Sequence, residues 1–459
     1  MSKTELTLEH FGRGTASAVG ARAGQFIFLG AQTPMDLETG TLGKGFKDVP
    51  ESARRQLATG MVFIDATEQG ILTQTWQIYE NVKRILAAHG ASLDDLVHQR
   101  IFLKRMRHLP SLERVMRAFM PQAPPSTTIL EATNPGVNPE IEVQADFIAA
   151  APGGPKRVNI SLPDLDHLTA PYPLATRAGQ YVFTSTLAGV DPKTGKIIES
   201  VDALTAEERE LLEPPYPAKV EAAVAQHLML FRHVRRILES QGAPLGSHIH
   251  QNGWLRIPMQ EFGPIAKVRR RLFAGRPNQA PSTALPVAGV RQDGALFEWQ
   301  VVALVPPRNR DEYRKDARMP AHPLTDFYLP AVNAGPFVFT AGEVAVETSG
   351  PSLVNRFSEV QDEGRFLSYG RIHQERPIMA ESWHVYQQLK SYLEACGSSM
   401  DQVLHQTLHM VNPADYPALE RIATLFYGPK LPPTTVVPIV GTSPYPEATL
   451  EAELVAVAM

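Results

Sequence analysis

The stretch HQRIFLKRMRHLPSLERVMRAFMPQAPPSTTIL, which begins at His98, sets the architecture of the chain because it occurs three times. It returns as HQNGWLRIPMQEFGPIAKVRRRLFAGRPNQAPSTAL from His250 and as HQTLHMVNPADYPALERIATLFYGPKLPPTTVV from His405, which are 152 and then 155 residues further on. A period of about 150 residues is the size of a small domain, not of a solenoid unit. We therefore expect three tandem copies of one domain, residues 1–152, 153–308 and 309–459, called repeats one, two and three below.

The same order of patterns runs through each repeat. A β-rich run opens it, and the three runs are Gln25–Gln32, Gln180–Leu187 and Pro336–Val344. A long helix with 3.6-residue periodicity follows, then a strand near the His-Gln pair, a second amphipathic helix and an alternating last strand. This order predicts an α+β fold with a mixed sheet and helices on one face. The other face is polar but regularly patterned, so we expect it to face another repeat.

Composition limits the class of protein. The chain has 459 residues, 43% of them hydrophobic, and a formal net charge of −4, which argues against nucleic acid or an anionic membrane as partner. The single cysteine, Cys396, fits a reducing compartment and a packing role. No secretory signal and no apolar run of about 18 residues is visible. We expect a soluble cytoplasmic protein whose partner is a small-molecule substrate.

Four motifs carry a resemblance to a known family. They are the strand FIFLG with its TG turn, the helix and exit NVKRILAAHGASLDDLV, the strand entry PST, and the last strand with the pattern E-x-[QE]. In all three repeats these motifs resemble the RidA/YjgF/YER057c/UK114 family over nearly their full length. Its members are homotrimers with helices outside, a β-barrel-like core and active clefts between subunits. The resemblance implies an intramolecular pseudo-trimer, alone or as a dimer of such units, with three different inter-repeat clefts.

The resemblance also defines a missing group. Family enzymes hydrolyse reactive enamines and imines such as 2-aminoacrylate, and an arginine just before the strand-entry Ser or Thr grips the substrate carboxylate. This sequence has Pro125, Pro281 and Pro433 at that position. Proline cannot hold a carboxylate, so we expect a substrate other than 2-aminoacrylate.

Catalytic candidates come from the last strand and from the start of each repeat. The family's acidic residue, which positions or protonates a water, matches Glu142, Glu298 and Glu451. Alternation places Glu142 and Gln144 on one face of their strand. The family tyrosine matches Tyr172 and Tyr328, whereas repeat one has Ser17. A buried carboxylate can serve as general acid or base, although a structural carboxylate at a repeat interface is an equal alternative.

Smaller polar residues complete the expected clefts. The family's cleft serine matches Ser185, where the other repeats have Gly30 and Ala341. The residues beside the missing arginine, and a private acid of repeat three, are further substrate-binding candidates: Thr127, Thr283, Thr435 and Glu343.

Histidines recur as well, but they do not indicate a metal site. His98, His250 and His405 are related by the repeat, and we expect them to hold the interface, with the following glutamines bonded to backbone or to one another. No short-spaced His or Cys set supports zinc, so no metal is expected. Nucleotide-binding motifs are absent from the sequence, and no cofactor is expected.

The leading hypothesis is a cofactor-independent hydrolase or deaminase that acts on a small imine, enamine or amide in an inter-repeat cleft. One alternative is chorismatase-like hydrolysis of an enol ether, for which arginines such as Arg100 or Arg256 would bind the carboxylates. Another is a non-catalytic protein that binds a ligand or stabilises other proteins.

Overall fold

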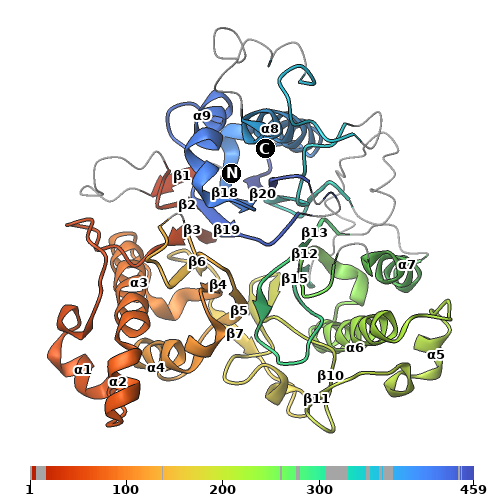
Figure 1. Ribbon diagram of the computed structural model, residues 1–459, viewed down its shortest axis with the longest axis horizontal. Helices are drawn as coiled ribbons and strands as arrows, with labels where there is room; N and C mark the ends of the chain where they lie inside the picture. Colours follow the sequence, from red (N-terminus) through yellow and green to blue (C-terminus); the bar gives the residue numbers. More distant parts are fainter. Residues whose placement is uncertain are drawn as a thin grey trace.

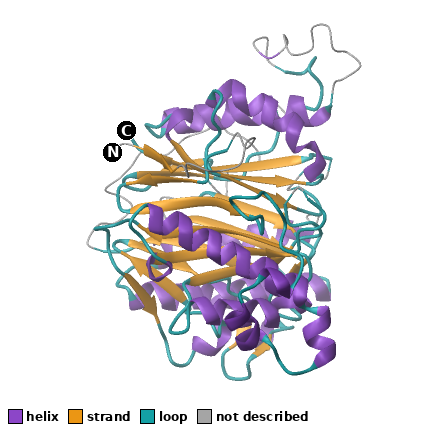
Figure 2. Ribbon diagram, turned by 90° about the vertical axis from the view of Figure 1, so that its left-hand side faces the viewer, coloured by secondary structure: helices purple, strands orange, loops and turns teal. Residues whose placement is uncertain are grey.

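The fold is taken from a computed structural model, which describes residues 3–6, 17–136, 138–258, 261–274, 280–306, 329–347, 352–360, 364, 376–442, 445 and 447–459. In these residues the chain is a mixed α+β protein with three large sheets and one two-stranded sheet. The large sheets lie around a common centre, and the long helices lie outside them (Figure 1). Figure 2 shows the sheets stacked between layers of helices. The α+β prediction is confirmed.

The strand order is alike in the three large sheets. The first has the order β1-β2-β3-β6-β4-β5-β14, the second β13-β12-β15-β9-β8-β7, and the third β16-β17-β20-β18-β19. In each, the His-Gln strand pairs in parallel with the strand-entry segment and antiparallel with the last strand of the repeat. The strands are β1 Lys3–Leu6, β2 Gly20–Ala23, β3 Phe26–Gln32, β4 Leu96–Leu103, β5 Ser126–Glu131, β6 Val143–Ala150, β7 Arg157–Ile160, β8 Ala175–Ala178, β9 Tyr181–Thr184, β10 Val190–Asp191, β11 Lys196–Ile197, β12 His248–Leu255, β13 Ser282–Pro286, β14 Gly289–Val290, β15 Phe297–Leu304, β16 Ala331–Asn333, β17 Phe337–Thr340, β18 Val403–Met410, β19 Thr434–Pro438 and β20 Leu450–Val457.

Two longer helices cover the outer face of each large sheet, and their apolar stripes make them amphipathic. The described α-helices are α1 Glu51–Leu57, α2 Val62–Thr67, α3 Gln69–Ala88, α4 Leu109–Phe119, α5 Ala206–Arg209, α6 Ala218–Ser240, α7 Phe262–Leu272, α8 Pro377–Ala395 and α9 Tyr416–Tyr427. Gly90, Gly242 and Gly397 follow the long helices α3, α6 and α8 with φ of 74–75°, the left-handed conformation that ends a helix without a Cβ penalty. Their stripes bury Val82, Val234 and Leu389 against the sheets.

A shared inner core joins the three sheets. Phe26, Tyr181 and Phe337, one from each repeat, pack with ring centroids 5.5–5.9 Å apart. The expectation that the polar sheet face meets other repeats therefore agrees with this packing. Strand pairing does not close the described strands into one barrel, so the predicted barrel-like core is corrected to separate sheets. Single connections link them: β14 of repeat two pairs with β5, and Ser17 bridges Leu431.

The same irregularity precedes the histidine of each His-Gln pair. The register of the antiparallel ladder shifts between Leu96 and His98, between His248 and His250, and between Val403 and His405. A bulge re-aims the side chains beyond it, and here it turns the histidines toward the common centre. The boundaries at 152/153 and 308/309 stay predictions. None of the described helices is long and apolar enough to cross a membrane.

Candidate active site

Strand register corrects one set of catalytic candidates. Gln144 lies opposite Phe102 on β4, the place that Glu298 takes opposite Trp254 and Glu451 takes opposite His409. Glu142 precedes β6 and is not the counterpart of the other two glutamates, as the sequence had suggested. Repeat one therefore has an uncharged amide where the other repeats have a carboxyl group, and the Gln144 side chain donates to the Val436 carbonyl of repeat three.

The Glu142 carboxylate lies on the helix side of repeat one. Its Oε2 is 3.9 Å from Nε2 of His108, whose Nδ1 contacts Glu68 at 2.8 Å. Its backbone N–H donates to Gln74 of α3. These contacts hold the loop before β6 against two helices. They place Glu142 away from the cleft in which a catalytic role was predicted for it.

A one-residue offset also separates the strand-entry candidates. Thr127 aligns with Ser282 and Thr434, because all three lie opposite the glutamine of the His-Gln pair. The missing-arginine position is thus Ser126 in repeat one, while Pro281 and Pro433 hold it elsewhere; none is an arginine. Thr283 and Thr435 lie one residue further and turn to the common centre, where they donate to Glu453 and Asp146. Thr435 therefore bonds at the centre and does not take the place of Thr127, whereas the Thr283 hydroxyl also lies beside Gly342 of repeat three.

The interface between repeats one and two brings two candidates into contact. The Ser185 hydroxyl of repeat two accepts from the Thr127 backbone N–H at 2.9 Å and donates to the Pro173 carbonyl at 2.7 Å. The Thr186 N–H donates to the Thr127 carbonyl at 3.2 Å. Thr127 and Ser185 are nearly inaccessible to solvent. Their bonds fix the two edges of this interface against one another.

Tyr172 crosses the same interface into repeat one. Its ring packs in the hydrophobic core of repeat one, and its hydroxyl donates to Glu113 of α4 at 2.9 Å. The guanidinium of Arg291 lies 5.8 Å from the centre of that ring and donates to the Leu168 and Ala170 carbonyls. Arg291 carries no signal in the sequence, because it follows β14 in a loop that has no matching residue type in the other repeats. Its guanidinium lies beside Tyr172, at a position other than the one where the family arginine is missing.

Besides Glu113, a second carboxyl group, that of Glu298, interacts with residues of this constellation. It is 1% exposed, and its Oε1 accepts from the Gln292 backbone N–H at 2.6 Å. Burial raises the pKa of Glu298, and the nearby Arg291 charge and the Gln292 N–H only partly oppose this effect. A buried carboxyl with a raised pKa can donate a proton near neutral pH.

The cleft between repeats two and three keeps a glutamate as well. A side chain placed at Gly342 would meet the Glu451 carboxylate and the Thr283 hydroxyl first, so these two groups lie close together. Glu343 is half-buried, and burial raises its pKa to about 8, with Tyr392 as the hydrogen-bond partner that opposes the shift. Tyr328 lies outside the described residues.

The cleft between repeats three and one contains a cavity of about 420 Å³. Tyr416, Thr434 and Val436 of repeat three form one wall, and segments 17–19 and 30–37 of repeat one form the other. Ser17 stands here where repeat two has Tyr172, so the bulky ring that crosses the first cleft is absent. None of the described residues that line this cavity carries a positive charge. Burial raises the pKa of Tyr416 to about 12, so its hydroxyl stays protonated as a donor.

The glutamines of the His-Gln pairs hold the cleft threonines. Gln99 accepts from Tyr79 and donates to Thr127, and Gln406 makes the same bonds with Tyr386 and Thr434. The prediction of backbone or mutual glutamine pairs is therefore wrong for these two. In the part of the chain that the structure describes, no group of three or more His, Cys, Asp or Glu side chains is arranged to hold a metal ion.

Comparison with known proteins relates the chain to one family. The model of the family Endoribonuclease L-PSP matches residues 59–149 and 320–458, together half of the chain. Two RutC family proteins, of Pyrococcus horikoshii and Pyrococcus abyssi, are 27% and 28% identical over 124 residues, which is 27% of this chain and 79% of each relative. The structure of RidA from an Antarctic Psychrobacter is 16% identical, covers 31% of this chain and 98% of its own, and has a TM-score of 0.24. The chain belongs to the Endoribonuclease L-PSP family, which is the RidA/YjgF/YER057c/UK114 family that its repeated motifs resemble.

Proposed function

We propose that this chain is a cofactor-independent hydrolase of the RidA class that cuts the C–N bond of a small imine, enamine or amide. The cleft between repeats one and two is the proposed catalytic cleft. One observation carries the proposal: the Glu298 carboxyl is buried and has a raised pKa, and the positive charge of Arg291, which lies beside Tyr172, interacts with it.

The proposed chemistry divides the work between two residues. Protonated Glu298 gives its proton to the nitrogen of an imine or amide, or to the β-carbon of an enamine, water adds to the carbon that carries the nitrogen, and the carboxylate then takes a proton from that water. Glu298 returns that proton to the nitrogen of the adduct, the C–N bond breaks with release of ammonia or an amine, and the hydroxyl group loses its proton to leave a carbonyl group. Arg291 supplies the charge that Ser126, Pro281 and Pro433 lack, so the preferred substrate carries a carboxylate or another anionic group. Two of the five guanidinium N–H groups bind backbone carbonyls, which leaves donors for that anion.

Ammonia release over a panel of imines, enamines and amides tests this proposal. Glu298→Gln is expected to lower the rate by about 10²–10⁴-fold, the usual contribution of a general acid–base. Arg291→Lys is expected to raise KM for anionic substrates more than for neutral ones, because lysine lacks the planar fork. Glu142→Gln is the matched control and should stay at the wild-type rate. A folded Glu298→Gln variant with full activity on every substrate would refute the mechanism.

We propose further that the three repeats form an intramolecular pseudo-trimer, functional as one chain or as a dimer. The matched strand order of the three sheets and their shared core support it. Light scattering should give the mass of one 50.5 kDa chain or of two. An obligate trimer of chains would contradict the proposal.

A ligand-binding role is the second candidate, and the open cavity between repeats three and one favours it. Its last-strand residue is Gln144, which cannot exchange a proton, so this cleft can bind a molecule but lacks the acid–base group. The expected ligand is small and without a negative charge. Ser17→Tyr copies the arrangement of Tyr172 and should fill the cavity. A fragment screen gives candidate ligands, and calorimetry measures their binding to the cavity. This binding should vanish in Ser17→Tyr, while Glu298-dependent turnover persists.

A further inference from the structure

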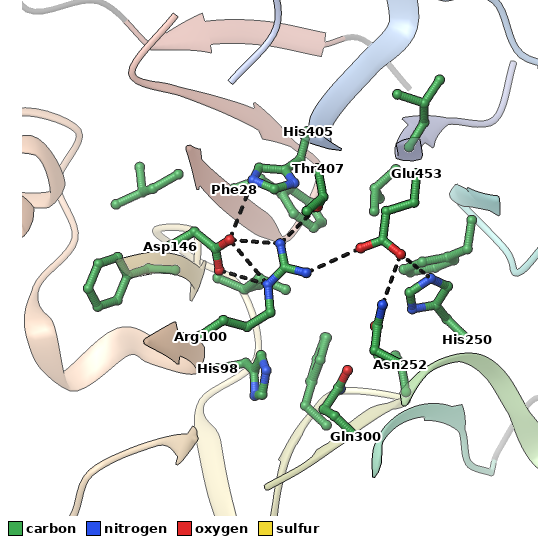
Figure 3. Close-up of a pocket in the computed structure, with 18 residues that line it drawn as sticks. Phe28, His98, Arg100, Asp146, His250, Asn252, Gln300, His405, Thr407 and Glu453 are labelled. Carbon is green, nitrogen blue, oxygen red and sulfur yellow. Dashed lines mark hydrogen bonds and ion pairs between the residues drawn. The ribbon is translucent and has the colours of Figure 1, made fainter. Parts of the chain in front are cut away.

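A second enclosed space lies where the three sheets meet, separate from the clefts. Its lining includes one phenylalanine and one histidine from each repeat, shown with their neighbours in Figure 3. The equivalent phenylalanines are Phe28, Phe183 and Phe339, the histidines are His98, His250 and His405, and Phe147 is a fourth phenylalanine in the lining. The space open to the centre of a water molecule is about 60 Å³. We call it the axial chamber.

Charged groups on one side of the axial chamber already have partners. The Arg100 guanidinium forms a forked pair with Asp146, at 2.7 Å for the shortest bond, and reaches Glu453 of repeat three at 3.2 Å. Glu453 also accepts from Asn252 and Thr283 of repeat two at 2.9 and 2.7 Å. His250 Nε2 lies 3.5 Å from the same carboxylate. This ion network therefore offers a guest no free charge.

His98 presents an unpaired acceptor to the chamber. The Ser126 hydroxyl donates its only proton to the Val97 carbonyl, so it must accept from Nδ1 of His98, 2.9 Å away. Burial lowers the pKa of His98 to about 3, and the ring is neutral. Its Nε2 is consequently a bare lone pair, and this atom has no hydrogen-bond partner although the residue is only 3% exposed.

Gln300 presents an unpaired donor. Its Nε2 has no partner among the described residues, and the residue is 3% exposed. Figure 3 shows His98 and Gln300 below the Arg100 guanidinium, with no dashed line from either to another residue drawn. Leaving a buried polar group unpaired costs about 1–3 kcal/mol, so two such groups facing one chamber point to a guest that bonds to both.

We propose that the axial chamber binds an uncharged, hydroxyl-bearing molecule, such as a short-chain alcohol or diol. A hydroxyl group donates to the His98 lone pair and accepts from the Gln300 N–H, whereas an ammonium lacks the acceptor and a carboxylate would face Asp146 and Glu453. At about 10–15 Å³ for each water position, the chamber holds roughly four to six heavy atoms. The phenylalanine rings contact the alkyl part of the guest.

Titration of the full chain with 1,2-butanediol tests the proposal, with the ¹⁵N resonance of His98 Nε2 as readout. We expect a saturable shift that persists in Ser17→Tyr and in Glu298→Gln, which separates the chamber from both clefts. Gln300→Leu should weaken binding about tenfold, the effect of one lost hydrogen bond. 1,6-Hexanediol is too long and should not bind.

Two outcomes would overturn the proposal. One is a shift that grows without saturation, or equally in wild type and Gln300→Leu. The other is a crystal structure of the diol-soaked chain with only water in the chamber. If Gln300→Leu fails to fold, binding of xenon and of the diol to the wild-type chain can be compared instead. Binding of xenon in preference to the diol would show that the chamber behaves as an apolar cavity and would contradict the proposal.

Discussion

A single position on the last strand separates the chemistry of the three clefts. It holds Gln144 in repeat one, Glu298 in repeat two and Glu451 in repeat three. The amide of Gln144 lines the cavity between repeats three and one, whereas Glu298 and Glu451 belong to the other two inter-repeat sites. The three inter-repeat sites therefore differ in acid–base chemistry, whereas the sites of a homotrimer would be identical.

The first prediction concerns the pH dependence of turnover. Because burial raises the pKa of Glu298, its proton-donating form persists to higher pH than that of an exposed glutamate. We expect kcat/KM to fall as pH rises through this pKa, since the acid form is the active one. Glu298→Gln should lose this alkaline limb, whereas Glu142→Gln should keep it. An unchanged limb in Glu298→Gln would assign it to another group.

The second prediction concerns Glu343 and stability. Its folded-state pKa of about 8 lies above the ordinary value of 4.5, so the unfolded chain loses the proton first as pH rises. The contribution of Glu343 to the free energy of unfolding is complete below pH 4.5 and is lost as pH rises to about 8. The difference in free energy of unfolding between Glu343→Gln and wild type should therefore shift in favour of the variant by about 1 kcal/mol or more between pH 4.5 and pH 8. Urea unfolding at both pH values measures this, and an equal difference at both would contradict it.

Packing between elements of different repeats limits what each cleft can accept. At Gly30 in β3 of repeat one, an added Cβ would lie 2.7 Å from the Thr434 backbone nitrogen of β19. A backbone atom cannot turn aside as a side chain can, so β3 and β19 would have to separate. Repeat two has Ser185 at the equivalent place and uses its hydroxyl to bond Thr127 instead.

The third prediction follows from this contact. Gly30→Ala should lower the free energy of unfolding by about 1–3 kcal/mol, the usual cost of overpacking. Gly263→Ala in α7 is the matched control, because nothing lies within 4 Å of the added methyl group and alanine favours a helix. Thermal and urea unfolding of the two variants should change in opposite directions. Equal stability of Gly30→Ala and wild type would show that the two strands yield easily.

Sequence periodicity predicted the strands and long helices because burial repeats along them, but it could not fix strand register. A two-residue slip leaves every side chain on the same face, so alternation alone cannot distinguish Glu142 from Gln144 as the counterpart of Glu298. The sequence alignment of Ser126–Thr128 with the other repeats can be shifted by one residue without changing the pattern, since all three residues are small and polar. Arg291 and Glu113 meet Tyr172 only after two repeats pack together, and no local pattern records that meeting.

At the centre of the molecule, equivalent positions of the three repeats carry different side chains, and these side chains bond to one another. Arg100, Asn252 and Thr407 are equivalent by register, and so are Asp146, Gln300 and Glu453. Three identical subunits would bring three guanidinium groups together on the axis, where like charges repel. One arginine, shared between Asp146 and Glu453, avoids this repulsion, and it bonds two repeats directly while Asn252 and Thr283 bring in the third through Glu453.

The last prediction removes this arginine. Arg100→Met leaves Asp146 and Glu453 buried without their guanidinium partner, so we expect a loss of about 3–5 kcal/mol in the free energy of unfolding. Adding Asp146→Asn and Glu453→Gln removes the two buried charges and should recover most of that loss. Arg84→Met breaks the exposed pair with Glu38 and serves as control, with an expected cost of about 1 kcal/mol or less. Urea unfolding compares the four proteins. If Arg100→Met cost no more than Arg84→Met, the axial ion network would not hold the repeats together, and the shared apolar core around Phe26 would have to do so alone.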